Sequence, residues 1–409
     1  MEEYTSSNES VIANIDHIKQ VNYAAIYKVI EKNAPISRVD VAKVSKLAPA
    51  SVTKITRQLL ENGLLTETAR QASTGGRRAI SLELNASAIN VLAIKIGRKQ
   101  LSIGRYNLAG VQLFKKQVPV MAENAEQLLA QLLSEIELVI VDCTQRDEKI
   151  SAITLTHAGL IDPIKGVILY SSRYSLENIC LVELIQTRFN IPAYLGNHTR
   201  CLALAEHYFG ASQDCKDSIL ISIHHGVGSG IIMQGKRLLG EKYNIGEIGH
   251  IQVNPAGKQC HCGNFGCLET EVSDDTIIEK VQEALNRGAI SSLSVEELSS
   301  ENIYQAAADG DPLCQKIVTD MVNYLGKTVA ILINILNPEK IIISGKITLC
   351  GNLLFSTLRQ SISQQTLHAF REKLQILPTA LAENPTIAAF ALAKQAIYEG
   401  DLLQKINNK

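Results

Sequence analysis

Three cysteines lie close together past the middle of the chain, in the stretch CHCGNFGC. They are Cys260, Cys262 and Cys267, and His250 precedes the first of them by ten residues. Thiolates and imidazole are ligands that Zn²⁺ prefers, and four of them complete a tetrahedral shell with no position left for a catalytic water. The spacing therefore predicts a structural zinc site. The alternative is three unliganded thiols beside an unrelated histidine, and His261 is a spare ligand that two ligating cysteines would crowd.

The remaining cysteines and the N-terminus indicate the compartment. The chain has nine cysteines, an odd number, and those outside the cluster are scattered through apolar stretches. This usage predicts reduced thiols in a cytoplasmic protein. The sequence has no run of about 18 apolar residues, and its first residues, MEEYTSSNES, are polar. We therefore expect neither a signal peptide nor insertion into a membrane.

Length and charge bound the organisation of the chain. With 409 residues, of which 46% are apolar, the chain is too long for one core, so two or three domains are expected. The net charge is only -1, so any binding of nucleic acid needs a local basic patch. Residues 16–80 supply one, with eleven Lys and Arg against five Asp and Glu, which leaves -7 for the remainder. This asymmetry predicts a nucleic-acid partner for the N-terminal segment.

Three helices are predicted in this basic segment. Apolar spacing gives a helix over 17–32, Ser37 is placed to cap a second helix, and Pro49 lies in the first turn of a third. Two short helices joined by a tight turn, the second with a polar and basic outer face, are typical of a helix-turn-helix. The groups on that face suit base edges and phosphates. They belong to Ser51, Thr53, Lys54, Arg57 and Gln58.

The stretch LLTETARQASTGGRRAISLEL predicts a wing of two strands after the third helix. Arg77 and Arg78 lie at its glycine-rich tip, where guanidinium groups suit a narrow minor groove. We therefore expect a flexible tail over 1–15 and a winged helix-turn-helix domain over 16–84 that binds a double-stranded DNA operator. The alternative is a helical protein-interaction domain with a solvated basic face.

The rest of the chain predicts an α/β body with an internal repeat. Strand-rich and helical segments alternate from about residue 86, and a similar strand meander restarts near residue 217. Such a repeat suits two lobes with a ligand cleft between them. We expect one lobe from 85–197 with 384–409, and a second from 198–383 that carries the zinc site and the oligomerisation surface. The glycine-rich turn HHGVGSG is a weak signal for a phosphate-binding loop.

Several motifs together resemble the ROK family of repressors and sugar kinases. They are GEIGH, CHCGNFGCLE and the helix-turn-helix stretch LAPASVTKITRQLLENGLL, and the similarity covers nearly the whole chain after the tail. The resemblance implies a two-lobed, actin-like and ribonuclease-H-like sugar-kinase fold with zinc beside a sugar pocket. It also implies sugar contacts from Gly159, Asn197, Glu247, His250 and Glu269. The alternative for both glutamates is a solvated surface charge.

Two elements that a kinase of this family needs are replaced. The catalytic base is the Asp of an Asn-Asp-Ala-Asn-like motif, and His198 stands at that position in Asn-His-Thr-Arg. The Asp-x-Gly-Gly-Thr phosphate motif reads Lys95-Ile96-Gly97-Arg98-Lys99, so the acid that orients the metal is missing. We therefore expect no enzyme but a transcriptional repressor on a catalytically inactive kinase fold. The family's Pro-Gly turn also differs, since it reads His157-Ala158-Gly159.

The resemblance further implies partners. It suggests a homodimer or tetramer that represses genes of amino-sugar (N-acetylglucosamine) uptake and catabolism. The effector that releases DNA would be a sugar phosphate, N-acetylglucosamine 6-phosphate, bound in the cleft. Because His198 changes the pocket, two alternatives remain: a regulator of another sugar system, or one controlled by a protein partner such as a sugar transporter domain.

Overall fold

The structure is a computed structural model that describes residues 15–68, 80–171, 173–240 and 244–407. The expected tail, except Ile15, and the wing tip with Arg77 and Arg78 lie outside the described residues. Within the described ranges, no helix has both the length and the apolar character needed to cross a bilayer. All nine cysteines fall in these ranges, and none of them forms a disulfide.

The N-terminal domain is the predicted winged helix-turn-helix. Its helices are α1 (Ile15–Asn33), α2 (Arg38–Ser45) and α3 (Pro49–Glu61). The Ser37 hydroxyl accepts a hydrogen bond from the Asp40 amide at 3.2 Å, as expected of an N-cap. Strands β2 (Leu65–Thr68) and β3 (Ser81–Leu84) form the wing. The two-residue strand β1 (Ile36–Ser37), too short to leave a periodic signal, also pairs with β3.

The first lobe contains a five-stranded sheet in the order β11-β7-β4-β5-β6. β4, β5 and β6 form the predicted antiparallel meander, while β7 and β11 run parallel to β4. The apolar side chains of α4 and α5 cover one face of the sheet. A second small sheet has the order β10-β9-β8. The bounds are β4 (Asn90–Ile96), β5 (Gln100–Asn107), β6 (Gln112–Pro119), α4 (Ala125–Gln145), β7 (Ile150–His157), β8 (Leu160–Asp162), β9 (Val167–Ser171), β10 (Leu176–Ile179), α5 (Leu181–Phe189) and β11 (Ala193–Asn197).

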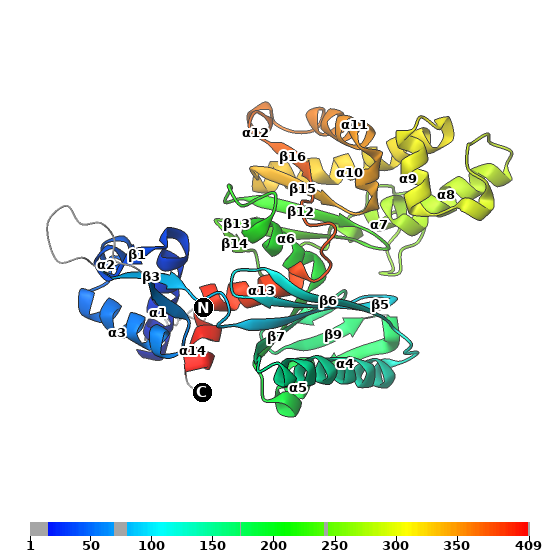
Figure 1. The fold of residues 1–409 in the computed structure, drawn as a ribbon. Coiled ribbons are helices and arrows are strands. Elements are labelled where there is room, and N and C mark those ends of the chain that lie inside the picture. The colour runs from blue at the N-terminus through cyan, green and yellow to red at the C-terminus, as the bar shows by residue number, and fades with distance from the viewer. Residues whose placement is uncertain (1–14, 69–79, 172, 241–243, 408–409) are drawn as a thin grey trace, which may run out of the picture.

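The second lobe repeats this architecture with a sheet in the order β14-β13-β12-β15-β16. Again an antiparallel meander is extended by parallel strands, and helices cover the outer face (Figure 1). The long helix α10 begins at a proline and spans Pro312–Leu336. The elements are β12 (Ser218–Ile223), β13 (Val227–Met233), β14 (Lys236–Arg237), α7 (Leu268–Val272), α8 (Asp274–Asn286), α9 (Ser300–Ala308), α10 (Pro312–Leu336), β15 (Lys340–Ser344), α11 (Asn352–Ser363), α12 (His368–Arg371) and β16 (Gln375–Pro378).

Two helices lie between the sheets. α6 (His198–Phe209) packs against β12 and β13, and α13 (Ile387–Tyr398) packs against β4, β7 and β11. The two helices also pack against each other, where the Phe209 and Phe390 rings stack with centroids 5.5 Å apart. α13 thus returns to the first lobe, as the sequence predicts. A further short helix, α14 (Asp401–Asn407), follows it and was not predicted.

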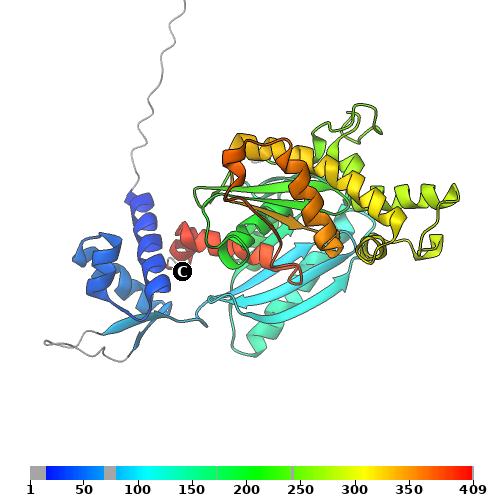
Figure 2. The same cartoon turned by 90° about the horizontal axis from the view of Figure 1, so that it is seen from above.

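The DNA-binding domain packs against the two C-terminal helices, α13 and α14. α1 packs on α13 and α14, and both views place the domain at one end of the body (Figures 1 and 2). At the contact, Glu31 of α1 pairs with Lys394 and accepts a hydrogen bond from the Tyr398 hydroxyl. One hydrophobic cluster therefore runs from α1 through α13 and α6 to the second sheet.

Candidate ligand site, metal centre and nucleic-acid surface

The four predicted zinc ligands converge in the structure. Their ligand atoms all lie within 4.8 Å of one another. Nδ1 of His250 is 3.6 Å from Sγ of Cys260, and Sγ of Cys262 is 3.7 Å from Sγ of Cys267. A tetrahedral ion with Zn–S bonds of about 2.3 Å needs its ligand atoms roughly 3.8 Å apart. The donor set and its spacing therefore fit zinc.

The backbone of the loop from His250 to Cys267, here called the cysteine loop, explains this convergence. His250 ends the 3₁₀ turn η2 (Ile248–His250), and the chain returns to it when Leu268 N donates to Ile251 O at 2.8 Å. Gly266 makes the return possible, because its φ is +59° and an added Cβ would lie 1.5 Å from the Asn254 carbonyl oxygen. Cys267 is thereby placed beside the backbone of His250, with Sγ 3.6 Å from its carbonyl oxygen.

Glu269 joins the cysteine loop to the glycine-rich turn. Its Oε2 accepts a hydrogen bond of 3.1 Å from Val227 N, and its Oε1 lies 3.2 Å from Nδ1 of His261. Gly226 leaves room for this carboxylate, because an added Cβ would lie 2.7 Å from it and displace it. Only 18% of the Glu269 side chain is exposed. Glu269 is therefore not a solvated surface charge. His261 is one of the groups that hold its carboxylate in place.

Glu247 is held by a residue that sequence reasoning passed over. Nη2 of Arg200 donates to its Oε1 at 2.6 Å, and Nε of the same arginine donates to Ile245 O at 2.8 Å. The Arg200 side chain is 7% exposed, whereas that of Glu247 is 42% exposed. The carboxylate is therefore fixed in direction and still accessible. An arginine in the first turn of a helix gives no sequence signal for this role.

Asn197 and Gly159 are also in contact. Nδ2 of Asn197 donates to the Gly159 carbonyl at 3.0 Å, while its Oδ1 caps α6 by accepting from Arg200 N at 3.2 Å. A chain of contacts thus runs from Gly159 through Asn197 and Arg200 to Glu247. It continues to the metal centre, because His250 N donates to Glu247 O at 3.2 Å. The structure therefore brings the five predicted sugar-binding residues into one connected region.

The two histidines that depart from the kinase pattern have different surroundings. Nδ1 of His157 lies 3.0 Å from Ile96 O, and Nε2 lies 2.9 Å from the Ser171 hydroxyl, so both ring nitrogens are used inside the protein. Burial lowers the pKa of His157. Nδ1 of His198 lies 3.2 Å from the Thr156 hydroxyl, and burial with the nearby charge of Lys95 lowers its pKa well below the usual value.

The outer face of α3 is available for DNA. Thr53, Lys54 and Arg57 are exposed, whereas Val52, Ile55 and Leu59 on the opposite side are buried. The two remaining predicted contacts, Ser51 and Gln58, are partly buried. Gln58 also accepts a hydrogen bond from the Tyr23 hydroxyl of α1, which fixes the position of α3 on its own domain.

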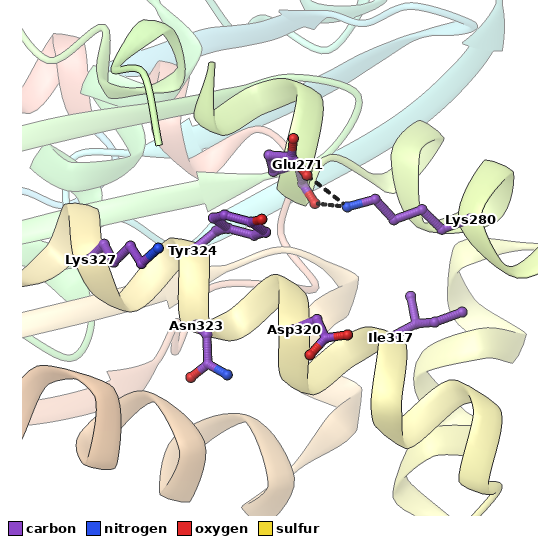
Figure 3. Close-up of a pocket in the computed structure, with 7 residues that line it drawn as sticks. All are labelled: Glu271, Lys280, Ile317, Asp320, Asn323, Tyr324 and Lys327. Carbon is purple, nitrogen blue, oxygen red and sulfur yellow. Dashed lines mark hydrogen bonds and ion pairs between the residues drawn. The ribbon is translucent and has the colours of Figure 1, made fainter. Parts of the chain in front are cut away.

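A pocket of about 420 Å³ lies in the second lobe between α7, α8 and α10 (Figure 3). Glu271 of α7 lines it and is 5% exposed. Its carboxylate accepts hydrogen bonds of 2.9 Å from both Asn254 and Lys280. Because Asn254 belongs to the cysteine loop, Glu271 ties that loop to α8. Figure 3 shows this carboxylate and the Lys280 ammonium pointing toward each other. The pocket was not predicted from the sequence.

The fold and the site together define a class of protein. A winged helix-turn-helix precedes a two-lobed body, and the body carries a Cys/His cluster beside two oriented glutamates. Lys95 and His198 lie at the positions where the resemblance to sugar kinases implies acids. The class is therefore a DNA-binding regulator built on a sugar-kinase fold.

Comparison with known proteins gives the family. The ROK family model matches residues 91–396, and a winged helix-turn-helix DNA-binding model matches residues 25–66. The chain belongs to the ROK family, and within it to the transcriptional repressors with an N-terminal winged helix-turn-helix, not to the kinases.

Individual relatives agree with this placement. The chain is 42% identical to the N-acetylglucosamine repressor of Escherichia coli O157:H7 over 98% of its own length and 99% of that protein. A crystal structure of a ROK family transcriptional regulator, a homologue of the Escherichia coli MLC protein, superimposes with a TM-score of 0.91 at 41% identity and covers 96% of this chain and 100% of that one. The ROK glucokinase of Streptomyces griseus has the same body fold, with a TM-score of 0.64 at 24% identity over 75% of this chain and 99% of its own.

Proposed function

We propose that this protein is a homodimeric or tetrameric cytoplasmic repressor of genes for amino-sugar uptake and catabolism. A sugar phosphate, N-acetylglucosamine 6-phosphate, would release it from DNA. The observation that carries the proposal is the 42% identity, over 98% of the chain, to a protein named N-acetylglucosamine repressor. The oriented carboxylates of Glu247 and Glu269 support a hydroxyl-rich ligand, because ionised carboxylates accept hydrogen bonds strongly.

The DNA half of the proposal rests on α3. Thr53, Lys54 and Arg57 project from its exposed face and would reach base edges and phosphates in the major groove. Ser51 and Gln58 would contact DNA from the edges of this face. Arg77 and Arg78 of the wing tip would enter the neighbouring minor groove. Two such domains in a dimer match a palindromic operator, whose half-sites are one helical turn or multiples apart.

The effector half rests on the connected region around the cysteine loop. Gly159, Asn197, Glu247, His250 and Glu269 would contact the sugar. Zinc, when bound to His250 and the three cysteines, would supply a fixed cross-link and no catalytic chemistry. His250 would use Nδ1 for the metal, which leaves Nε2 for a sugar hydroxyl. Loss of the cross-link would release the loop that carries His261, the partner of Glu269 in α7.

The packing of α6 and α13 suggests how the two halves communicate. Asn197 caps α6, α6 packs on α13, and α13 contacts α1 of the DNA-binding domain. A ligand that prefers one arrangement of the lobes would therefore shift the placement of the two recognition helices in a dimer. The ligand can change DNA affinity only by as much as it prefers one lobe arrangement over the other, typically about 1–3 kcal/mol.

The test is fluorescence anisotropy of the full-length protein on a palindromic operator from an amino-sugar uptake gene, at fixed salt. The expected result is tight binding that N-acetylglucosamine 6-phosphate weakens about 5- to 150-fold. A shuffled DNA of equal length is the control. Absence of specific binding would refute the repressor function. Specific binding that ignores the sugar phosphate would refute the effector and favour another sugar or a protein partner.

A further inference from the structure

Lys95 is a partly buried lysine that has no role in the sites described above. It lies near the C-terminal end of β4, on the same face as Val91 and Ala93, which pack toward α13. Burial alone lowers the pKa of its ammonium group. Throughout the described residues, no hydrogen-bond or ion-pair partner reaches it. Because an unpaired charge becomes costly as it is buried, an anion beside this lysine would be stabilised.

The neighbours of Lys95 can also bind an anion. In the sheet, Lys95 is paired with Thr156 of β7, so both side chains leave the same face of adjacent strands. The Thr156 hydroxyl contacts His198, the first residue of α6. Burial and, after it, the nearby charge of Lys95 lower the pKa of both His198 and His224. These three basic groups, one from each of three elements, therefore surround one region.

The surroundings of the cluster favour a negative charge over a positive one. The His224 side chain is 51% exposed, so the cluster is accessible to a ligand. The Asp274 carboxylate lies 3.9 Å from Nδ1 of His224, and it already accepts a hydrogen bond from Tyr304. α6 begins beside the cluster and has twelve residues, and the Asn197 side chain caps only one of its free N–H groups. The remaining N–H groups favour anions at this helix end.

Phosphate suits this arrangement better than a single carboxylate. It offers three acceptor oxygens and carries a charge of about -1.5 to -2 at neutral pH, and lysine binds it as a compact point charge. We propose that Lys95, His198 and His224 form an anion site for the phosphate group of a phosphorylated sugar. This assignment rests on the proposed function, because the sugar ring would occupy the neighbouring contacts from Asn197 to Glu269. It also explains why basic residues replace kinase acids here.

The test is isothermal titration calorimetry on the full-length protein with N-acetylglucosamine 6-phosphate, N-acetylglucosamine and inorganic phosphate. The wild type is expected to bind the phosphorylated sugar at least about 10-fold more tightly than the unphosphorylated one. Lys95→Met should reduce affinity for the phosphorylated sugar by about 10- to 100-fold and leave affinity for the unphosphorylated sugar nearly unchanged. Lys99→Met removes an equal charge from an exposed position four residues away and is the matched control.

Three outcomes would overturn the anion site. One is equal loss of affinity for both sugars in Lys95→Met, which would make Lys95 a structural residue. Another is no loss for either, and the last is failure of the wild type to bind inorganic phosphate and a panel of hexose and hexosamine 6-phosphates. Lys95→Arg, which keeps the charge, should restore part of the affinity if Lys95→Met also perturbs folding. Inorganic phosphate that binds as tightly as the sugar phosphate would identify the free ion as the ligand.

Operator binding separates this proposal from the proposed function. Each variant is titrated onto the operator without effector, and all are expected to bind like the wild type because Lys95 lies outside the DNA-binding domain. If the wild type fails to bind the operator but still binds the phosphate probes, the repressor function fails and the anion site stands. If operator binding is specific while the phosphate probes do not bind, the anion site alone fails.

Discussion

Arg200 and Glu247 form an ion pair of 2.6 Å that joins the start of α6 to the segment before the cysteine loop. Arg200 is buried and Glu247 is accessible, so the pair holds a surface carboxylate from the inside. The second terminal nitrogen of Arg200, Nη1, is buried and has no hydrogen-bond partner among the described residues. The side-chain hydrogen bonds of Arg200 thus go to Glu247 and to the Ile245 carbonyl.

Replacing Arg200 should affect both stability and ligand binding. We expect Arg200→Met to lower the free energy of unfolding by about 1–3 kcal/mol, since it breaks a charged hydrogen bond. Sugar affinity should fall as well, because Glu247 would lose its fixed direction. Arg188→Met is the control: its partner Glu137 is exposed like Arg188 itself, so the loss should stay below about 1 kcal/mol. Equal losses in urea denaturation would contradict the special role of Arg200.

The pair of Glu31 and Lys394 should carry much of the contact between the DNA-binding domain and the body. The Lys394 side chain is 8% exposed and that of Glu31 is 20% exposed. Glu31→Gln leaves a buried ammonium without its counter-charge, which costs about 3 kcal/mol or more. The double variant Glu31→Gln, Lys394→Met should recover part of this loss. Denaturant unfolding of the wild type, Glu31→Gln, Lys394→Met and the double variant checks it, and additive losses in the double variant would contradict the coupling.

Features that depend on neighbouring residues could be predicted from the sequence, whereas contacts between distant residues could not. α10 begins at a proline and ends at Asn337-Pro338, so its bounds follow from neighbouring residues. The cysteine cluster is equally local, and its four members converge. Arg200–Glu247 and Glu31–Lys394 join residues 47 and 363 positions apart, and no periodicity encodes such pairs. The same holds for His157, because the stretch His157-Ala158-Gly159 gave no hint that Ser171 is its partner.

His157 should make the protein sensitive to mild acid. Because burial lowers its pKa in the folded state, the unfolded chain binds a proton more readily below about pH 6.5. Its contribution to stability is therefore lost as pH falls from about 6.5 toward the lowered folded pKa. In His157→Gln, the decrease in the free energy of unfolding between pH 7 and 5 should be smaller. His368→Gln, whose native side chain is 79% exposed, is the control. An unchanged pH slope in His157→Gln would contradict this assignment.

The metal centre should depend on each of its cysteines. We expect the wild type to contain about one zinc per chain, and Cys262→Ser to contain much less, because a thiolate ligand is lost. Cys180→Ser is the matched control, since Cys180 is also exposed but lies outside the cluster. Elemental analysis after gel filtration measures the metal, and melting with and without a chelator measures its effect on stability. Full zinc content in Cys262→Ser would refute this ligand set.

Replacing Arg57 should test directly whether the exposed face of α3 contacts DNA. It is exposed on the polar face of α3, one helical turn after Thr53. If Arg57 contacts a phosphate, Arg57→Ala should weaken operator binding and reduce the slope of log K against log salt by about one. If it contacts a guanine edge, affinity should fall by about 1–3 kcal/mol with relaxed base preference at one position.

Salt titration of anisotropy on matched and single-substituted operators distinguishes the two roles of Arg57. Arg287→Ala is the control, because Arg287 is 81% exposed and follows α8 in the second lobe. A uniform loss on every operator, with a shallower salt slope, identifies phosphate binding. A loss confined to one base position identifies base recognition. If Arg57→Ala binds every operator like the Arg287 control, another face of the domain meets DNA, because an exposed guanidinium at a protein–DNA interface cannot be electrostatically silent.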